Sequence, residues 1–148
     1  MIINEIKAKG TLSVVLKDEN GNLKDKREIN NLVVDTGLDF IASRMKDTTD
    51  DAMSYMAIGT GTTAAAAGDT TLGTELDRNA LTSTTVTDNS IAYVASWGAG
   101  DGTGAVTEAG IFNAASAGSM LARTVFDVVN KSANDTLSIT WTITLSAS

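Results

Sequence analysis

Three residue types are missing from this 148-residue chain, and each absence excludes a class of chemistry. The sequence contains no cysteine, no histidine and no proline. Without cysteine there is no disulfide framework and no thiolate nucleophile. Without histidine the commonest general base and the commonest transition-metal ligand are missing. A Ser-His-Asp or Cys-His active site is therefore excluded, and a zinc site is disfavoured because its usual ligands are missing.

Positive charge is scarce as well. The chain has 11 Lys and Arg against 18 Asp and Glu, which gives a net charge of −7. Such a surface repels phosphate backbones and anionic lipid, so we expect no nucleic-acid partner and no membrane partner. No apolar run approaches the roughly 20 residues that span a bilayer, and the N-terminus does not resemble a signal peptide. The sequence therefore predicts a protein made and kept in a cytoplasm-like compartment.

Alternation of apolar and polar residues, which marks half-buried β-strands, dominates the pattern. It is clearest at 137–145, where Leu, Ile and Trp share one parity and Ser and Thr fill the other. Seven or eight short strands predict a mainly β protein: a single β-sandwich domain over residues 1–148, with a jelly-roll-like double sheet as one version. The other expected strands span 5–17, 23–34, 55–58, 76–87, 91–97, 105–112 and 121–129.

One short α-helix is predicted near residues 36–46. Asp35 or Thr36 can cap its start, because a short polar side chain accepts hydrogen bonds from the first free backbone N–H groups. Residues at i, i+3, i+4 and i+7 form one apolar stripe that should face the core. These residues are Leu38, Ile41, Ala42 and Met45.

The first thirty residues are predicted to form an N-terminal strand and hairpin that projects from the body or lies at a sheet edge. Its second half, Lys24 to Glu28, carries charge on both faces, as edge strands often do. We interpret residues 1–30 as lacking a core role and as carrying contacts between subunits by strand addition. The candidate contact residues are Ile2, Ile3, Ile6, Lys7 and Lys9.

Glycine and acidic residues invite two ligand-binding interpretations. Gly59-Thr-Gly61 with Gly68 superficially resembles a phosphate-binding loop, but Asp69 follows where a lysine is needed, and no helix pattern comes next. Asp101 in the glycine-rich stretch 98–104, and the acidic group 47–51 with Asp47, Asp50 and Asp51, do not match a calcium-loop pattern. We favour solvated loops for both and expect no cofactor and no metal.

Three carboxylates, Glu75, Asp77 and Glu108, raise the alternative of a glycoside-hydrolase pair. The sequence does not place them within reach of one another. Arg78 and Arg123 are equally suitable partners, and structural ion pairs at strand ends are the favoured interpretation. A carbohydrate-binding module is a more distant alternative, since it needs aromatic side chains on an exposed strand face, and this chain has few aromatics.

Two glycine-broken blocks stand in the middle of the chain. The first is Met56-Ala-Ile-Gly-Thr-Gly61, followed by Leu72, Glu75 and Arg78, and the second is Thr107-Glu-Ala-Gly-Ile-Phe112, followed by Leu121-Ala122. Together with the lead-in Asn31-Leu-Val-Val-Asp-Thr-Gly-Leu38, they make residues 30–126 resemble the phage tail-collar fibre family. The resemblance implies a β-rich structural protein of a bacteriophage virion, with no catalytic residues to carry over, and hence not an enzyme.

Tail-collar proteins usually continue into a long fibre, whereas this sequence stops at Ser148, soon after a well-formed strand. We therefore expect a capsid decoration, or cement, protein that binds and stabilises the assembled head shell from outside. Its expected partners are the major capsid protein and copies of itself, as a trimer or dimer. The alternative is a small tail or tail-collar fibre component.

Overall fold

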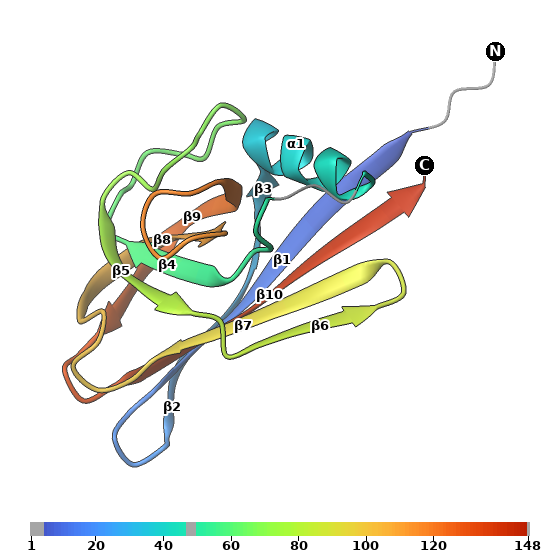
Figure 1. Ribbon diagram of the computed structural model, residues 1–148. Helices are drawn as coiled ribbons and strands as arrows, with labels where there is room; N and C mark the ends of the chain where they lie inside the picture. Colours follow the sequence, from blue (N-terminus) through green and yellow to red (C-terminus); the bar gives the residue numbers. More distant parts are fainter. Residues whose placement is uncertain (1–4, 47–49, 148) are drawn as a thin grey trace.

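The computed structural model describes residues 5–46 and 50–147. In this part of the chain, two five-stranded antiparallel sheets pack face to face, with one α-helix beside them (Figure 1). The predicted β-sandwich with one short helix is thereby confirmed. Sheet A has the order β2 (Leu23–Asn30), β1 (Ile6–Lys17), β10 (Thr136–Ala147), β7 (Ser90–Trp97), β6 (Ser83–Thr87). Sheet B has the order β3 (Leu32–Val33), β9 (Met120–Lys131), β8 (Gly104–Phe112), β4 (Tyr55–Gly59), β5 (Glu75–Ala80).

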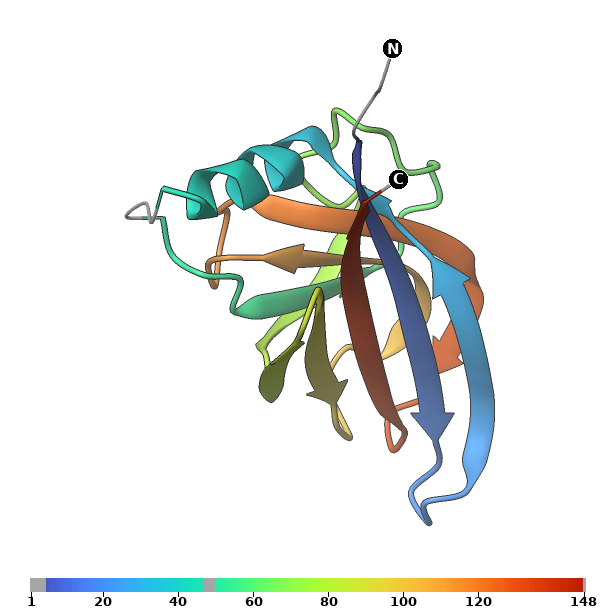
Figure 2. The same ribbon diagram turned by 90° about the vertical axis from the view of Figure 1, so that its right-hand side faces the viewer.

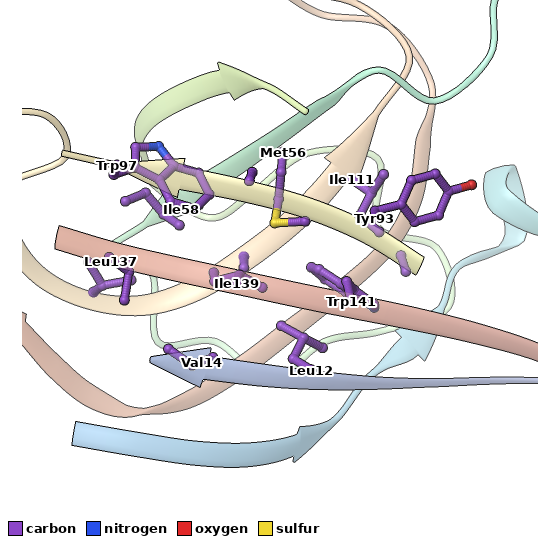
Figure 3. Close-up of a cluster of buried hydrophobic side chains, with 14 of the residues drawn as sticks. Leu12, Val14, Met56, Ile58, Tyr93, Trp97, Ile111, Leu137, Ile139 and Trp141 are labelled. Atoms are coloured by element: carbon purple, nitrogen blue, oxygen red, sulfur yellow. The ribbon is translucent and has the colours of Figure 1, made fainter. Parts of the chain in front are cut away.

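The core lies between the two sheets and is built from the apolar parity of their strands (Figure 3). Alternation along β10 buries Leu137, Ile139 and Trp141 against side chains from β4 and β8 of the other sheet. Trp97 and Trp141 are the largest fully buried side chains. Burying an aromatic of this size removes about 150–250 Å² from water, so we expect these two residues to be among the largest single contributors to the hydrophobic stabilisation.

The N-terminal hairpin belongs to the body of the sandwich. β1 lies between β2 and β10 inside sheet A, and its residues Leu12, Val14 and Leu16 are buried in the core. The interpretation that residues 1–30 have no core role is therefore wrong, and deleting them should unfold the domain. The expectation of an edge position holds for β2, whose charged residues lie along one edge of sheet A. The turn that joins β1 and β2 extends beyond the neighbouring turns (Figure 2).

The helix α1 (Asp35–Arg44) lies against β9, and only part of the predicted apolar stripe meets the core, since Ile41 packs against it. Leu38 and Met45 point to solvent, while Gly37 is buried against the backbone of Leu121. The predicted side-chain cap is also wrong: Val34 is the N-cap residue, and no side chain caps it. Thr36 instead donates its hydroxyl to the carbonyl of Met120 at 2.8 Å. The close backbone contact at Gly37 thus accompanies a helix face on which part of the predicted stripe is turned to solvent.

The strand expected at 76–87 is two strands in different sheets. β5 pairs with β4 in sheet B, and β6 pairs with β7 in sheet A. Leu81 and Thr82 make the crossing between them, with the Leu81 N–H donating to Ser54 and the Thr82 N–H to Val94. The threonine-rich pattern predicted the extended backbone correctly and gave no sign of the change of sheet.

The segment between β4 and β5, residues 60–74, contains no helix or strand, as expected from its glycine and threonine content. It folds over the outer face of sheet B, where Leu72 joins Ala57, Phe112 and Met120 in a second, smaller apolar cluster. Sheet B is therefore covered on both faces, whereas the outer face of sheet A is open. Over the described residues, no helix is both long and apolar enough to cross a bilayer.

Candidate functional site

The two glycine-broken blocks of the sequence meet at one buried carboxylate. Glu108, from the middle of β8, lies on the outer face of sheet B beneath the 60–74 loop, and its side chain is fully buried. It accepts hydrogen bonds from three loop N–H groups: Gly61 at 2.6 Å, Gly73 at 2.7 Å and Thr74 at 2.8 Å. The carboxylate of the second block thus holds both ends of the loop that belongs to the first block.

Arg123, from β9, is the counter-ion of Glu108. Its guanidinium is almost fully buried and contacts Glu108 Oε1 through Nη2 at 3.0 Å and through Nε at 3.2 Å. The same guanidinium donates to Asp69 at 2.7 Å and to the carbonyl of Thr63 at 3.0 Å, both in the loop. Because each charged group has several partners, the cluster can be buried without leaving an uncompensated charge.

The environment holds Glu108 in its ionised form. Burial by itself would raise the pKa of the Glu108 carboxyl, but the N–H groups of Thr74, Gly73 and Gly61 and the Arg123 guanidinium outweigh burial and bring the pKa below its ordinary value. The pKa of Asp69 is also lowered, first by the N–H of Ala66 and then by Arg123. A general acid or base at neutral pH needs a pKa moved toward 7, so these shifts run in the opposite direction.

Two glycines of the first block make room for the carboxylate. A Cβ atom at Gly59 or at Gly61 would overlap Glu108 Oε2, and at Gly59 it would also overlap the carbonyl oxygen of Thr74. The Gly-Thr-Gly sequence is thus explained by close approach of backbone and carboxylate. The phosphate-loop interpretation has an alternative here, because Glu108 already occupies the N–H groups that a bound anion would use.

A second arginine fixes the neighbouring turn. Arg78, from β5, pairs with Glu75 at 2.6 Å and donates to the carbonyls of Ala114 and Ala117 in the β8–β9 turn. Its guanidinium also lies 3.8 Å from the centre of the Phe112 ring, within cation–π range. Both arginines singled out in the sequence therefore partner a glutamate, as predicted, and each also holds a loop. Only the Glu75–Arg78 pair begins at a strand end, because Glu108 lies in the middle of β8.

Two of the three carboxylates of the hydrolase alternative are each engaged by an arginine. Glu75 faces Arg78 and Glu108 faces Arg123. Asp77 lies near Lys131, a buried lysine that donates to the carbonyl of Gly98 at 2.8 Å. Burial lowers the pKa of Lys131, and the carboxylates of Asp135, Asp101 and Asp77 act against that shift.

For the metal interpretations, residues 5–46 and 50–147 contain no group of three or more acidic side chains placed to hold an ion. Asp47, one of the acidic residues considered from sequence, lies outside the described residues. Of the proposed contact residues, Ile2 and Ile3 also lie outside them. Ile6 is 81% exposed, and Lys7 and Lys9 are exposed in the N-terminal half of β1.

Sequence reasoning missed an apolar groove beside α1. It lies where the helix meets the ends of β6, β7 and β10, and Val86, on its rim, is 70% exposed. The signal available in the sequence was a valine within a threonine run, which by itself is too weak to indicate a groove. The other main apolar lining residues are Phe40, Ile41, Ile91, Tyr93, Ile143 and Leu145.

Comparison of the chain with protein-family models, with curated proteins and with solved structures gave no match.

Proposed function

We propose that this protein is a structural component of a bacteriophage particle, most simply a decoration protein that binds the assembled head shell and stabilises it. The observation that carries the proposal is the use made of the two blocks that resemble the tail-collar fibre family. Glu108 of the second block binds the loop that follows the first block and pairs with Arg123, the residue after Leu121-Ala122. Arg78 of the first block binds the turn that follows the second block. This is the role expected of charged residues in a structural protein, where they stabilise one conformation of the chain.

The fold is consistent with that role. A two-sheet sandwich presents strand edges and exposed apolar side chains, here Val86 and Ile6, to neighbouring molecules. Such contacts, each of modest strength, add up when many copies bind a symmetric shell and each other. The partners under this proposal are the major capsid protein and further copies of the chain, in a virion assembled in the host cytoplasm.

The carbohydrate-binding alternative receives no support from the aromatic residues. All seven aromatic side chains lie in the described part of the chain, and each is buried or half-buried. A sugar platform needs an aromatic face open to solvent, and Tyr93, Trp97 and Trp141 instead face the core. A tail or tail-collar component remains the second candidate, since the same resemblance favours it.

Copy number and position in purified particles test the proposal. Quantitative mass spectrometry of the particles, calibrated on the major capsid protein, should give many copies per head, and immunogold labelling should cover the head surface. A few copies confined to one vertex or to the tail would replace the decoration role with the tail role. Absence from purified particles would overturn both.

A direct binding experiment sharpens the result. Purified protein added to heads that lack it should bind to saturation and raise the temperature at which the heads release DNA. Glu108→Gln protein, whose loop is expected to be loosened, is the informative variant, with Glu75→Gln as its matched control. Binding that is equal for all three proteins would show that the 60–74 loop takes no part in attachment.

A further inference from the structure

The four edge strands of the two sheets differ in how they are protected. An edge strand presents unpaired backbone N–H and C=O groups, and proteins usually protect such edges with charge, short length or a bulge. β2 carries five consecutive charged residues, Lys24 to Glu28. β5 carries Glu75, Asp77 and Arg78, and β3 is two residues long. Three of the four edges therefore have a recognisable safeguard.

The fourth edge strand, β6, has none of these. Its sequence is Ser83-Thr-Thr-Val-Thr87, without charge, and β-branched in four of its five residues. All five residues are exposed, and the uncharged stretch extends from Asn79 to Thr87 in a chain whose net charge is −7. Figure 1 shows β6 as the free margin of sheet A, beside β7. Its composition therefore favours pairing of its free edge with another strand.

The hairpin geometry shows which backbone groups are free. Asp88 and Asn89 form a two-residue loop between Thr87 and Ser90, which face each other in the register. Residues that flank such a loop exchange hydrogen bonds, and these exchanges recur at every second residue of an antiparallel pair. Ser83, Thr85 and Thr87 therefore direct their backbone groups toward β7. Thr84 and Val86 direct theirs outward.

We propose that β6 pairs in antiparallel fashion with β6 of a second copy of this chain, on a two-fold axis at Thr85. In this register Thr84 of each copy faces Val86 of the other, so that every outward N–H and C=O group of the two strands has a partner. A contact between two identical surfaces brings like charges together. β6 is an edge of this acidic molecule where that repulsion is avoided, and this favours a second copy as the occupant.

The same register extends the apolar groove beside α1. Thr84 and Val86 share the face of β6 that Tyr93 and Ile91 share on β7, the face that lines the groove. Residues that face each other across an antiparallel pair project to the same side of the sheet. Val86 of the second copy therefore lies on the groove side, next to Thr84, and covers apolar surface that is exposed in the single chain.

This inference deepens the proposed function by naming the surface through which copies contact, and it rests on that function only for the expectation that copies do contact. The two can fail separately. A protein that dimerises through β6 in solution but is absent from particles removes the virion role alone. A particle protein that stays monomeric in solution at every concentration removes the β6 contact alone.

The absence of cysteine allows a clean cross-linking test. Facing residues that do not exchange hydrogen bonds have Cα atoms about 4.5 Å apart, within the range that a disulfide spans. Thr85→Cys protein should therefore form a disulfide-linked dimer under mild oxidation, seen on a non-reducing gel. Thr11→Cys is the matched control, since Thr11 is also an exposed threonine on the outer face of sheet A, but on an inner strand. Equal rates of cross-linking for the two variants would overturn the proposal.

Sedimentation velocity over a range of concentrations gives an independent measurement. Wild-type protein should approach twice the 15.3 kDa chain mass as its concentration rises. Val86→Pro removes an outward N–H without removing a bond to β7 and should weaken the dimer at least about tenfold. Its circular dichroism melt checks that the fold is retained. Unchanged association of Val86→Pro protein would show that β6 pairing is wrong. The same conclusion would follow if Ile2→Asp and Ile3→Asp abolished association while Thr85→Cys protein failed to cross-link.

Discussion

The cluster around Glu108 and the edge at β6 treat polar groups in opposite ways. Glu108 and Arg123 are charged groups under the 60–74 loop, almost fully buried, and each has several partners. β6 is open to solvent, carries no charge, and has one side of its backbone unpaired. Globular proteins usually place charge at the surface and apolar or uncharged groups inside, so both regions depart from the common arrangement.

The difference separates two tasks. Burying a charge is costly unless its partners are in place, so the Glu108 cluster tolerates only one loop conformation. An uncharged edge imposes little cost and excludes few partners, so β6 stays free to pair. The interior charges therefore define the shape of the single chain, and the absence of charge at the edge defines where another chain can join it.

The largest effect is expected at Glu108. Glu108→Gln keeps the shape of the side chain but removes the fully buried one of the two carboxylates that pair with Arg123, and breaking a buried pair in this way costs about 3–5 kcal/mol of the free energy of unfolding. Glu75→Gln removes the partner of Arg78 at a more exposed pair and should cost no more than about 1 kcal/mol. Urea denaturation of both variants measures the difference, and equal losses would contradict the structural role assigned to Glu108.

The second effect is a dependence of stability on pH. The pKa of Glu108 is lowered in the folded chain, so its contribution is fully present above its ordinary pKa of 4.5 and is lost as pH falls through the lower, folded-state pKa. Asp69 behaves in the same way. Wild-type protein should therefore lose stability steadily on acidification below about pH 4.5, and Glu108→Gln protein should lose less over the same interval. Denaturation curves at several pH values test this, and parallel losses would contradict it.

The smallest effect on folding is expected at β6. Thr84→Lys and Thr85→Lys place charge on an exposed edge and should change the free energy of unfolding of the single chain by no more than about 0.5 kcal/mol. The measurement is made at protein concentrations too low for association. A loss of several kcal/mol would show that the edge is part of the structure of the single chain and not a free surface.

Sequence patterns correctly predicted the parts of this fold in which burial follows from the local order of residues along a strand. Alternation along β10 and β7 placed Trp141 and Trp97 in the core, because the parity of a strand is a local property. The partial exposure of the apolar stripe on α1 was missed, since apolar spacing does not report contacts between distant segments, such as that of Gly37 with the backbone of Leu121. The change of sheet after β5 was missed for a similar reason.

The candidate site shows the same division. The sequence predicts that Glu108 and Arg123 each belong to an ion pair, but leaves open which carboxylate each arginine contacts. Their shared hold on the loop was not predicted, because Gly61, Asp69 and Gly73 come from positions 35 to 54 residues away along the chain from their partners. A glutamate inside the apolar run from Val106 to Phe112 was the available signal, and the glycines of the Gly-Thr-Gly stretch were the matching one.

The pairing of β1 with β10 has a consequence for how the chain becomes folded. It joins Ile6 to Ala147, almost the entire described chain apart, in the middle of sheet A. During synthesis the ribosome releases β1 long before β10, so β1 lacks its inner neighbour until β10 emerges. Contacts of such long range also slow spontaneous folding, because a large loop must close before they form. Completion of sheet A therefore waits for β10, and a nascent chain exposes the core face of β1 until that strand has emerged.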